Sequence, residues 1–200
     1  MTAERAPAQQ DRAAGIQLVV AMAALMWLVE IIDSIDRHRL DSWGIEPRDV
    51  EGLRGVVAAP FLHASFDHLI GNTIPFVILG LAIALSGLAR VAIVTGVVVL
   101  IGGLGTWVFA PENTVHIGAS GVVFGYASYL ISRGIFDKSL TEMAMGALVV
   151  AVWGGALLTS LVPHPGISWQ GHLFGAIGGI VAARLLAPPR QGVTSPAEGV

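Results

Sequence analysis

Residues 116 to 126 read His116-Ile117-Gly118-Ala119-Ser120-Gly121-Val122-Val123-Phe124-Gly125-Tyr126, which places one serine between glycines where an apolar stretch begins. From Gly118 to Ile135 there are eighteen residues, and the only charged side chain among them is Arg133. This length and apolar character predict a membrane-spanning helix with Ser120 in its first turn.

The expected place of Ser120 at a helix N-terminus has a chemical consequence. The first turn of a helix carries unpaired backbone N–H groups and the positive end of the helix dipole, so it stabilises an alkoxide or a tetrahedral oxyanion. The neighbouring glycines let a substrate backbone approach closely. Small residues and serines are also common in membrane helices for packing, so this string alone favours packing. Ser120 becomes a candidate nucleophile only if other motifs meet it.

The composition of the whole chain indicates the class of protein. Of its 200 residues, 54% are hydrophobic and only 12% are charged, whereas about a quarter are charged in an ordinary soluble domain. We therefore expect an all-α polytopic protein that lies in the lipid bilayer. The lack of cysteine rules out disulfides and cysteine-ligated metal sites. The net charge of −3 argues against nucleic-acid binding.

Six apolar stretches follow one another along the chain and predict six spans. Their approximate limits are 16–32, 66–85, 91–109, 118–135, 143–162 and 170–186. We expect one membrane domain at residues 15–187, between a disordered tail at residues 1–14 and a second tail at residues 188–200. The long first loop, residues 33–60, is expected to form short surface helices, with Trp43 and Leu53 dipping into the interface. Glu30 and Asp33 are interpreted as interfacial charges.

The basic residues indicate how such a domain would be oriented. With six spans, both termini share one side of the membrane with the loops that follow spans two and four. That side would carry seven of the eleven Lys and Arg residues, namely Arg5, Arg12, Arg90, Arg133, Lys138, Arg184 and Arg190. We therefore expect a multi-pass protein of the cell membrane with both termini in the cytoplasm. The four arginines of the first loop run against this, although that loop is long and rich in acids.

Three polar motifs would then meet at one depth. Spans two, four and six all enter from the outer face, and each begins with unusual polar residues. Span two has His63, His68 and Asn72, span four has Ser120, and span six has His172. Scattered polar residues are not expected to share a level, so the coincidence indicates a functional site that opens toward the outer face.

His172 opens the last span within a glycine pattern that predicts close helix packing. Glycines recur at every fourth residue in two spans: Gly171, Gly175 and Gly179 in the sixth, and Gly121 and Gly125 in the fourth. Such smooth faces let two backbones lie close together. This contact would bring His172 within reach of Ser120, where a neutral imidazole can take the serine proton as general base and return it to a leaving amine.

His68 and Asn72 are four residues apart, so they lie on one face of a helix. Both side chains donate hydrogen bonds, and together with the Ser120 N–H they can hold a developing oxyanion. The alternative is that they bond neighbouring helices, and for Asn72 considered alone that interpretation is the better one.

The set of motifs resembles the rhomboid intramembrane serine proteases, over nearly the whole chain from about Leu40 onward. The motifs that carry the resemblance are His63-x4-His68-x3-Asn72, Gly118-x-Ser120-Gly121 and Gly171-His172-x2-Gly175-x3-Gly179. They match in order, spacing and helix position. The resemblance implies a bundle of six transmembrane helices with a Ser–His dyad and no acidic third member.

The resemblance also implies a role for each residue of the motifs. Ser120 would be the nucleophile and His172 its base, while His68, Asn72 and Gly118 would support the oxyanion. His63 matches a further family histidine whose role is structural or water-binding. Phe124 stands where the family commonly has a tyrosine stacked on the catalytic imidazole, and a phenyl ring can still stack there.

The expected function is therefore intramembrane serine endopeptidase activity on transmembrane segments of other membrane proteins, without metal or other cofactor. A catalytically silent relative that binds membrane proteins is the first alternative, although its usual signature, loss of the serine or histidine, is absent. A histidine-based metal or proton transporter is a second alternative, which lacks the acidic partners expected inside such a bundle. The sequence names neither the substrate nor the oligomeric state.

Overall fold

The structure, a computed structural model, describes residues 5–164 and 166–188 and is all-helical. Its helices are α1 (Arg5–Ile35), α2 (Gly55–Ala58), α3 (Phe66–Ala84), α4 (Leu88–Phe109), α5 (Ser120–Asp137), α6 (Leu140–Thr159) and α7 (Trp169–Leu185). Three 3-10 helices lie between α1 and α3: η1 (Leu40–Trp43), η2 (Glu51–Arg54) and η3 (Ala59–Phe61). Polytopic helical architecture is thus confirmed.

Four of the described helices are long and apolar enough to cross a membrane: α1 from Ala8, α3, α4 and α6. The other two long helices, α5 and α7, do not qualify. α7 has only 17 residues, and in α5 the serines, glycines, Arg133 and Asp137 lower the mean hydropathy. The predicted count of six spans is therefore not confirmed and stays a prediction. α5 and α7 are less apolar than the other long helices because they pack mainly against other helices. Small and polar residues can stand there in place of the long apolar residues of a lipid-facing span.

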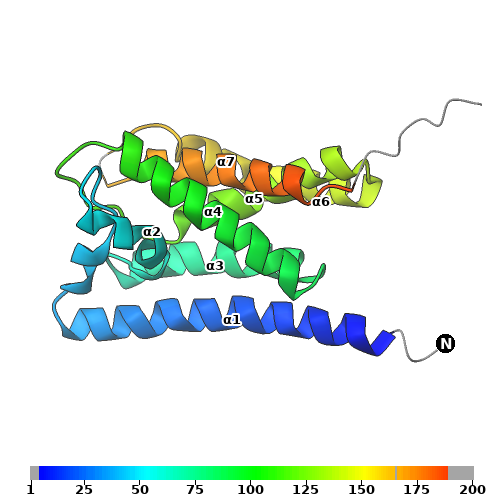
Figure 1. Cartoon of the computed structure of the whole chain (residues 1–200), viewed down its shortest axis with the longest axis horizontal. Helices are drawn as coiled ribbons and strands as arrows, with labels where there is room; N and C mark the ends of the chain where they lie inside the picture. Colours follow the sequence, from blue (N-terminus) through cyan, green and yellow to red (C-terminus); the bar gives the residue numbers. More distant parts are fainter. Residues whose placement is uncertain (1–4, 165, 189–200) are drawn as a thin grey trace, which may run out of the picture.

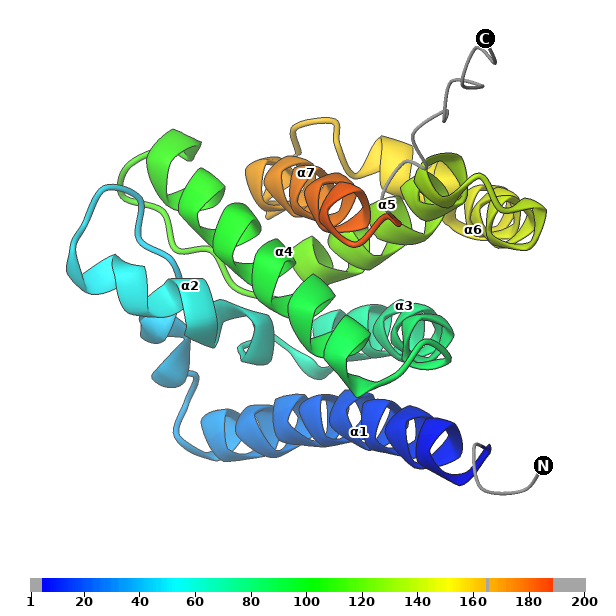
Figure 2. The ribbon, with the colours of Figure 1, turned by 45° about the vertical axis from the view of Figure 1, so that its right-hand side comes forward.

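α5 lies in the middle of the bundle, where it packs against α3, α4, α6 and α7. α1 covers one side and contacts α3 and α4, while α6 covers the other side of α5 (Figures 1 and 2). The start of α1 and the end of α7 lie at one end of the bundle (Figure 1). The starts of α3, α5 and α7 lie at the opposite end, so the predicted polar motifs share one level.

The close contact of α5 with α7 depends on glycines, as expected from their spacing. A Cβ on Gly175 would collide with the carbonyl oxygen of Gly121, and a Cβ on Gly179 would collide with that of Gly125. The backbones therefore approach more closely than any residue with a side chain permits. This contact brings the first turns of α5 and α7 together.

The N-terminal stretch differs from the expected disordered tail, because α1 begins at Arg5. Asp11 explains why the helix extends so far. Its Oδ1 accepts a hydrogen bond from the Leu88 N–H at 3.2 Å, which caps the first turn of α4. Residues 1–4 and 189–200 of the predicted tails lie outside the described residues.

The first loop contains the expected short helices, and it is attached to the rest of the bundle at several points. Ile45 and His116 exchange two backbone hydrogen bonds of 2.9 and 3.0 Å. Arg48 forms an ion pair with Glu112 at 2.8 Å. The first loop therefore lies against the segment that precedes α5 and is bonded to it.

Glu30 and Asp33, interpreted from sequence as interfacial charges, are instead buried by protein. Their exposed fractions are 0% and 1%. The first loop turns back at the end of α1, where the Leu40 N–H donates to Asp33 Oδ1 at 2.7 Å, a contact that sequence patterns could not indicate.

Candidate active site

Ser120 is the first residue of α5, and the turn before it is set by a glycine. Gly118 has a φ of 112°, a left-handed conformation that favours glycine. Ala119 is the residue before the helix, and the backbone N–H of Ser120 lies in the first helical turn. The Ser120 hydroxyl oxygen lies 2.9 Å from His172 Nε2. The structure thus brings the two residues together across α5 and α7.

The imidazole of His172 is fixed by two further contacts. Its Nδ1 lies 2.8 Å from the backbone carbonyl oxygen of Ser160, just after α6. A carbonyl can only accept, so Nδ1 carries the proton, and in the neutral ring Nε2 presents its lone pair to the Ser120 hydroxyl. The Phe124 ring stacks on the imidazole with a centroid distance of 4.2 Å and an interplanar angle of 3°.

The Ser160 carbonyl is a contributor that the sequence analysis missed. It occupies the place that an acidic residue holds in a Ser-His-Asp triad, where the third group orients the imidazole. α6 ends at Thr159, and the carbonyls of a helix's last turn have no partner within the helix. The break near Pro163 was the only sequence signal that such a carbonyl would be available.

His68, Asn72 and Gly118 also lie together, although one of them is arranged differently from the expectation. A Cβ on Gly118 would lie 2.7 Å from His68 Cε1 and 3.6 Å from Asn72 Nδ2, so both side chains face this glycine. The Gly118 N–H, however, donates to the Ala59 carbonyl at 2.9 Å. Gly118 therefore contributes space for the His68 ring, and its N–H is already engaged.

Asn72 is buried and donates one hydrogen bond from Nδ2 to the His68 carbonyl at 3.1 Å. An amide nitrogen carries two hydrogens, so one remains to donate toward the space beside Gly118. The His68 ring is half-buried, above the same space. Both side chains can therefore present donors to one acceptor.

His63 is fully buried just before α3 and has a structural contact. Its Nε2 accepts a hydrogen bond from the Ala119 N–H at 3.4 Å, and its ring meets the His68 ring edge-on at 5.1 Å. Burial, and next the proximity of His68, lower the pKa of His63 to about 4. At neutral pH His63 is therefore uncharged, as an acceptor of this bond must be, and it supports the turn before Ser120.

A cavity of about 840 Å³ opens onto the Ser120–His172 pair. Its lining comes from α3, from the loops before α5 and α7, and from the pair itself. The polar residues that line it include His68, Asn72, Ser120, Ser160, Ser168, Gln170 and His172. Water can therefore occupy the space next to the hydroxyl of Ser120.

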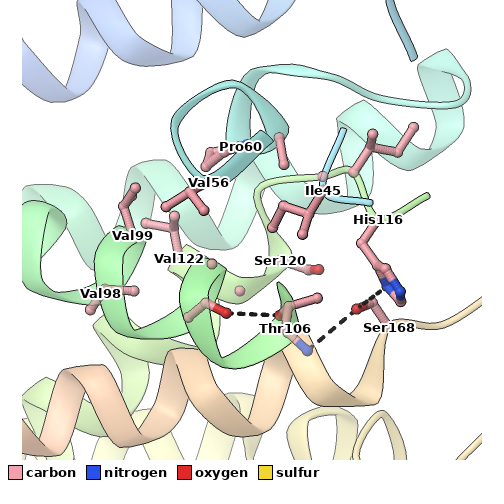
Figure 3. Close-up of a pocket in the computed structure, with 17 residues that line it drawn as sticks. Ile45, Val56, Pro60, Val98, Val99, Thr106, His116, Ser120, Val122 and Ser168 are labelled. Carbon is pink, nitrogen blue, oxygen red and sulfur yellow. Dashed lines mark hydrogen bonds between the residues drawn. The ribbon is translucent and has the colours of Figure 1, made fainter. Parts of the chain in front are cut away.

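A second, smaller recess of about 50 Å³ lies on another side of Ser120 (Figure 3). Its wall is mainly apolar and includes Val56, Pro60, Val98, Val99 and Val122. His116 and Ser168 close one side, where His116 Nδ1 lies 2.7 Å from Ser168 Oγ. His116 carries no role in the motifs that the sequence analysis singled out. The structure instead places it between the segment before α5 and the start of α7.

The comparison with known protein families agrees with the geometry. The model of the Rhomboid domain matches residues 51–189, which is most of the chain. The chain belongs to the rhomboid family. The resemblance drawn from the motifs is thereby confirmed.

Several relatives align with two thirds or more of this rhomboid chain. An uncharacterized protein of Mycobacterium tuberculosis is 42% identical over 181 residues, which cover 86% of this chain and 75% of the relative. YdcA of Bacillus subtilis, named as a candidate rhomboid protease, is 25% identical over 88% of this chain and 90% of its own length. The rhomboid protease GluP of the same organism is 26% identical over 66% of this chain and 25% of GluP.

Proposed function

We propose that this rhomboid protein is a serine endopeptidase that hydrolyses a peptide bond in or next to a transmembrane segment of another membrane protein. One observation carries the proposal: Ser120 Oγ lies 2.9 Å from His172 Nε2, while His172 Nδ1 is held at 2.8 Å by the Ser160 carbonyl. A nucleophile, a base and a group that orients the base are the arrangement that activates a serine.

The chemistry proceeds in two stages. The Ser120 oxygen attacks the substrate carbonyl carbon while Nε2 of His172 takes the hydroxyl proton. The imidazolium that forms is stabilised by the Ser160 carbonyl dipole in place of a carboxylate. His172 then protonates the leaving amine, and the peptide bond breaks to leave an acyl group on Ser120. Water from the cavity of about 840 Å³ attacks this ester in the same way and restores the serine.

The oxyanion of each tetrahedral intermediate would form beside Gly118. The Ser120 N–H at the start of α5 and the free amide hydrogen of Asn72 are donors toward this place, and His68 supplies a third when its ring N–H faces it. Such preorganised donors lower the barrier by several kcal/mol in water-excluded sites, and removing one costs roughly a hundredfold or more in rate.

The surroundings of Ser120 support a substrate that is locally unwound. A stable helix hides its scissile carbonyl in hydrogen bonds, so the reacting stretch must contain small or helix-breaking residues. The recess of about 50 Å³ beside Ser120 has room only for a small side chain. We propose that both termini lie in the cytoplasm and that the site opens toward the outer face, since the polar motifs lie at the end of the bundle opposite the start of α1 (Figure 1).

Reconstituted liposomes provide the test, with a labelled single-span substrate that carries small residues in its transmembrane segment. The unmodified protein should release cleaved product, while Ser120→Ala and His172→Ala should fall at least roughly a thousandfold below it. Ser132→Ala, on the same helix, is the matched control and should cleave normally. Cleavage by Ser120→Ala would refute the proposal, and binding without cleavage by the unmodified protein would favour the silent binder.

A further inference from the structure

A second cluster of polar side chains lies away from the catalytic pair, where α1 ends and the first loop begins. Asp33, His38 and Asp41 each present one ligand-type atom, and these atoms all lie within 4.8 Å of one another. His38 Nδ1 is 3.7 Å from Asp33 Oδ2 and 3.8 Å from Asp41 Oδ2. The end of α1 at this place lies at the left of Figure 1.

The carboxylate of Asp33 is buried but only half satisfied. Its side chain is 1% exposed, and Oδ1 accepts a hydrogen bond from the Leu40 N–H at 2.7 Å. Oδ2, the atom that faces His38, has no hydrogen-bond partner among the described residues. Oδ1 of Asp41 is likewise buried without a partner. Buried polar atoms without a partner are uncommon and call for an explanation such as an ion.

Glu30 provides a second, independent observation. It lies one helical turn before Asp33, its exposed fraction is 0%, and neither carboxylate oxygen has a hydrogen-bond partner in the part of the chain that the structure describes. No Lys or Arg within the described ranges forms an ion pair with Glu30, Asp33 or Asp41. Two buried acids and Asp41, whose side chain is 24% exposed, thus lie near one imidazole, and buried carboxylate oxygens without partners are expected to bind a cation or a proton.

The backbone turn is shaped to bring the imidazole over these acids. Arg37 and His38 have φ values of 61° and 57°, a left-handed conformation that is unfavourable for residues with a side chain. The turn is closed by the His38 N–H, which donates to the Asp33 carbonyl at 2.8 Å. Two successive left-handed residues thus bring the His38 ring beside Asp33.

From this arrangement we infer that Asp33, His38 and Asp41 bind a divalent zinc ion, with Glu30 as the neighbouring carboxylate. Two carboxylates and one imidazole are ligands that zinc prefers, whereas calcium and magnesium take oxygen ligands only. Ligand atoms around a tetrahedral zinc are roughly 3.3–3.6 Å apart, and His38 Nδ1 lies only slightly farther than this from Asp33 Oδ2 and Asp41 Oδ2, at 3.7 and 3.8 Å.

This ion would connect the end of α1 to the start of the first loop. The other end of that loop supports the candidate active site, because the Ala59 carbonyl binds the Gly118 N–H and His63 binds the Ala119 N–H. The zinc site is therefore structural and lies apart from Ser120 and His172. The sequence analysis expected no metal and interpreted Glu30 and Asp33 as interfacial charges.

Equilibrium dialysis of the full chain tests the inference. The protein, purified in detergent without a polyhistidine tag, is dialysed against buffered micromolar free zinc, and bound metal is measured by mass spectrometry. About one zinc per chain is expected for the unmodified protein. Asp33→Asn and His38→Gln should bind zinc at least roughly tenfold more weakly. The control is Asp36→Asn, whose half-exposed side chain pairs with Arg39 at 3.8 Å; it should bind as the unmodified chain does.

Two results would overturn the inference. The first is an unmodified chain that binds no more zinc than His38→Gln, and the second is binding of calcium in preference to zinc. His38 is 42% exposed in its side chain, so His38→Gln is expected to fold even where Asp33→Asn does not. Thermal unfolding of each variant is measured with zinc and with chelator. A cooperative transition shows that the variant is folded, so that its zinc binding can be compared with that of the unmodified chain. Zinc should raise the unfolding midpoint of the unmodified chain and of Asp36→Asn, but not that of Asp33→Asn or His38→Gln.

Discussion

The imidazole of His172 is held by two residues of α5 and by one carbonyl at the end of α6. Ser120, His172 and Phe124 were predictable from the sequence, because each contributes a side chain at a recognisable spacing. The Ser160 carbonyl was not, since every residue has one and its place depends on where α6 ends. The hydrogen bond from the Gly118 N–H to the Ala59 carbonyl was equally unpredictable, because Ala59 belongs to a distant loop.

Phe124 allows a test of how far ring stacking positions the base. Phe124→Ala removes the stacked ring, which we expect to lower the rate of substrate cleavage about fivefold, as stacking of this kind is worth about 1 kcal/mol. Phe124→Tyr keeps a ring of the same shape and should retain most of the rate. Equal rates for the alanine variant and the unmodified chain would show that the Ser160 carbonyl alone orients His172.

His63 predicts a pH dependence of stability. Its pKa of about 4 in the fold is below the usual value of 6.5, because burial disfavours the charged ring. Between pH 4 and pH 6.5 the unfolded chain therefore binds a proton on His63 that the folded chain does not bind. The contribution of His63 to the free energy of unfolding is thus highest above pH 6.5 and falls as the pH drops toward 4. Between pH 7 and pH 5 the loss from this one residue is about 2 kcal/mol.

His63→Gln separates this contribution from those of other groups. Glutamine can still accept from the Ala119 N–H but does not titrate. Thermal unfolding in detergent at pH 7 and pH 5 should show a larger fall in the midpoint for the unmodified chain than for the variant. Equal falls in both proteins would contradict the assignment.

At the scale of helices, the contact between α5 and α7 determines whether Ser120 and His172 meet. Gly175→Ala would push a methyl group into the Gly121 carbonyl. We expect a loss of about 2 kcal/mol or more in unfolding free energy, together with a large loss of activity, because the helices must separate. Denaturant unfolding and the cleavage assay measure the two effects.

Gly155→Ala in α6 is the matched control. A Cβ there meets nothing within 4 Å, so the variant should be neutral or more stable by up to about 1 kcal/mol. If Gly175→Ala were as stable and active as Gly155→Ala, the glycine contact would not determine the geometry of the site.

The sequence predicted most helices to within a few residues, because their apolar stretches are bounded by Gly, Pro and charged residues. It failed at the start of α1. There Asp11 caps α4 through a contact between residues 77 positions apart, which no local pattern reveals. It also treated Glu30 and Asp33 as interfacial, since a loop that folds back over a helix end leaves no periodic signal.

For the whole molecule, the open question of topology can be tested with single cysteines, as the natural chain has none. Val50→Cys and His164→Cys lie at the end of the bundle with the polar motifs, and Ala89→Cys and Leu140→Cys lie at the other end. All four positions are exposed. A membrane-impermeant maleimide added to intact cells should label the first two only, because six spans place both termini inside.

Labelling of Leu140→Cys or Ala89→Cys in intact cells would contradict this orientation. Val50 and His164 are expected on the outer side, and Ala89 and Leu140 on the inner side. If only one position of either pair were labelled, the two would lie on opposite sides of the membrane, which would contradict the six-span count. The unmodified chain, which carries no thiol, gives the background for every comparison.

The central claim is that Ser120 is activated by His172, and a fluorophosphonate probe tests it most directly. The probe forms a covalent bond with an activated serine, and the labelled peptide is identified by mass spectrometry. We predict labelling of the peptide that contains Ser120 in the unmodified chain and in Ser132→Ala, and none in Ser120→Ala or His172→Ala. An unmodified chain, folded in lipid, that takes up no label, or a His172→Ala variant that labels as fast as the unmodified chain, would contradict the account.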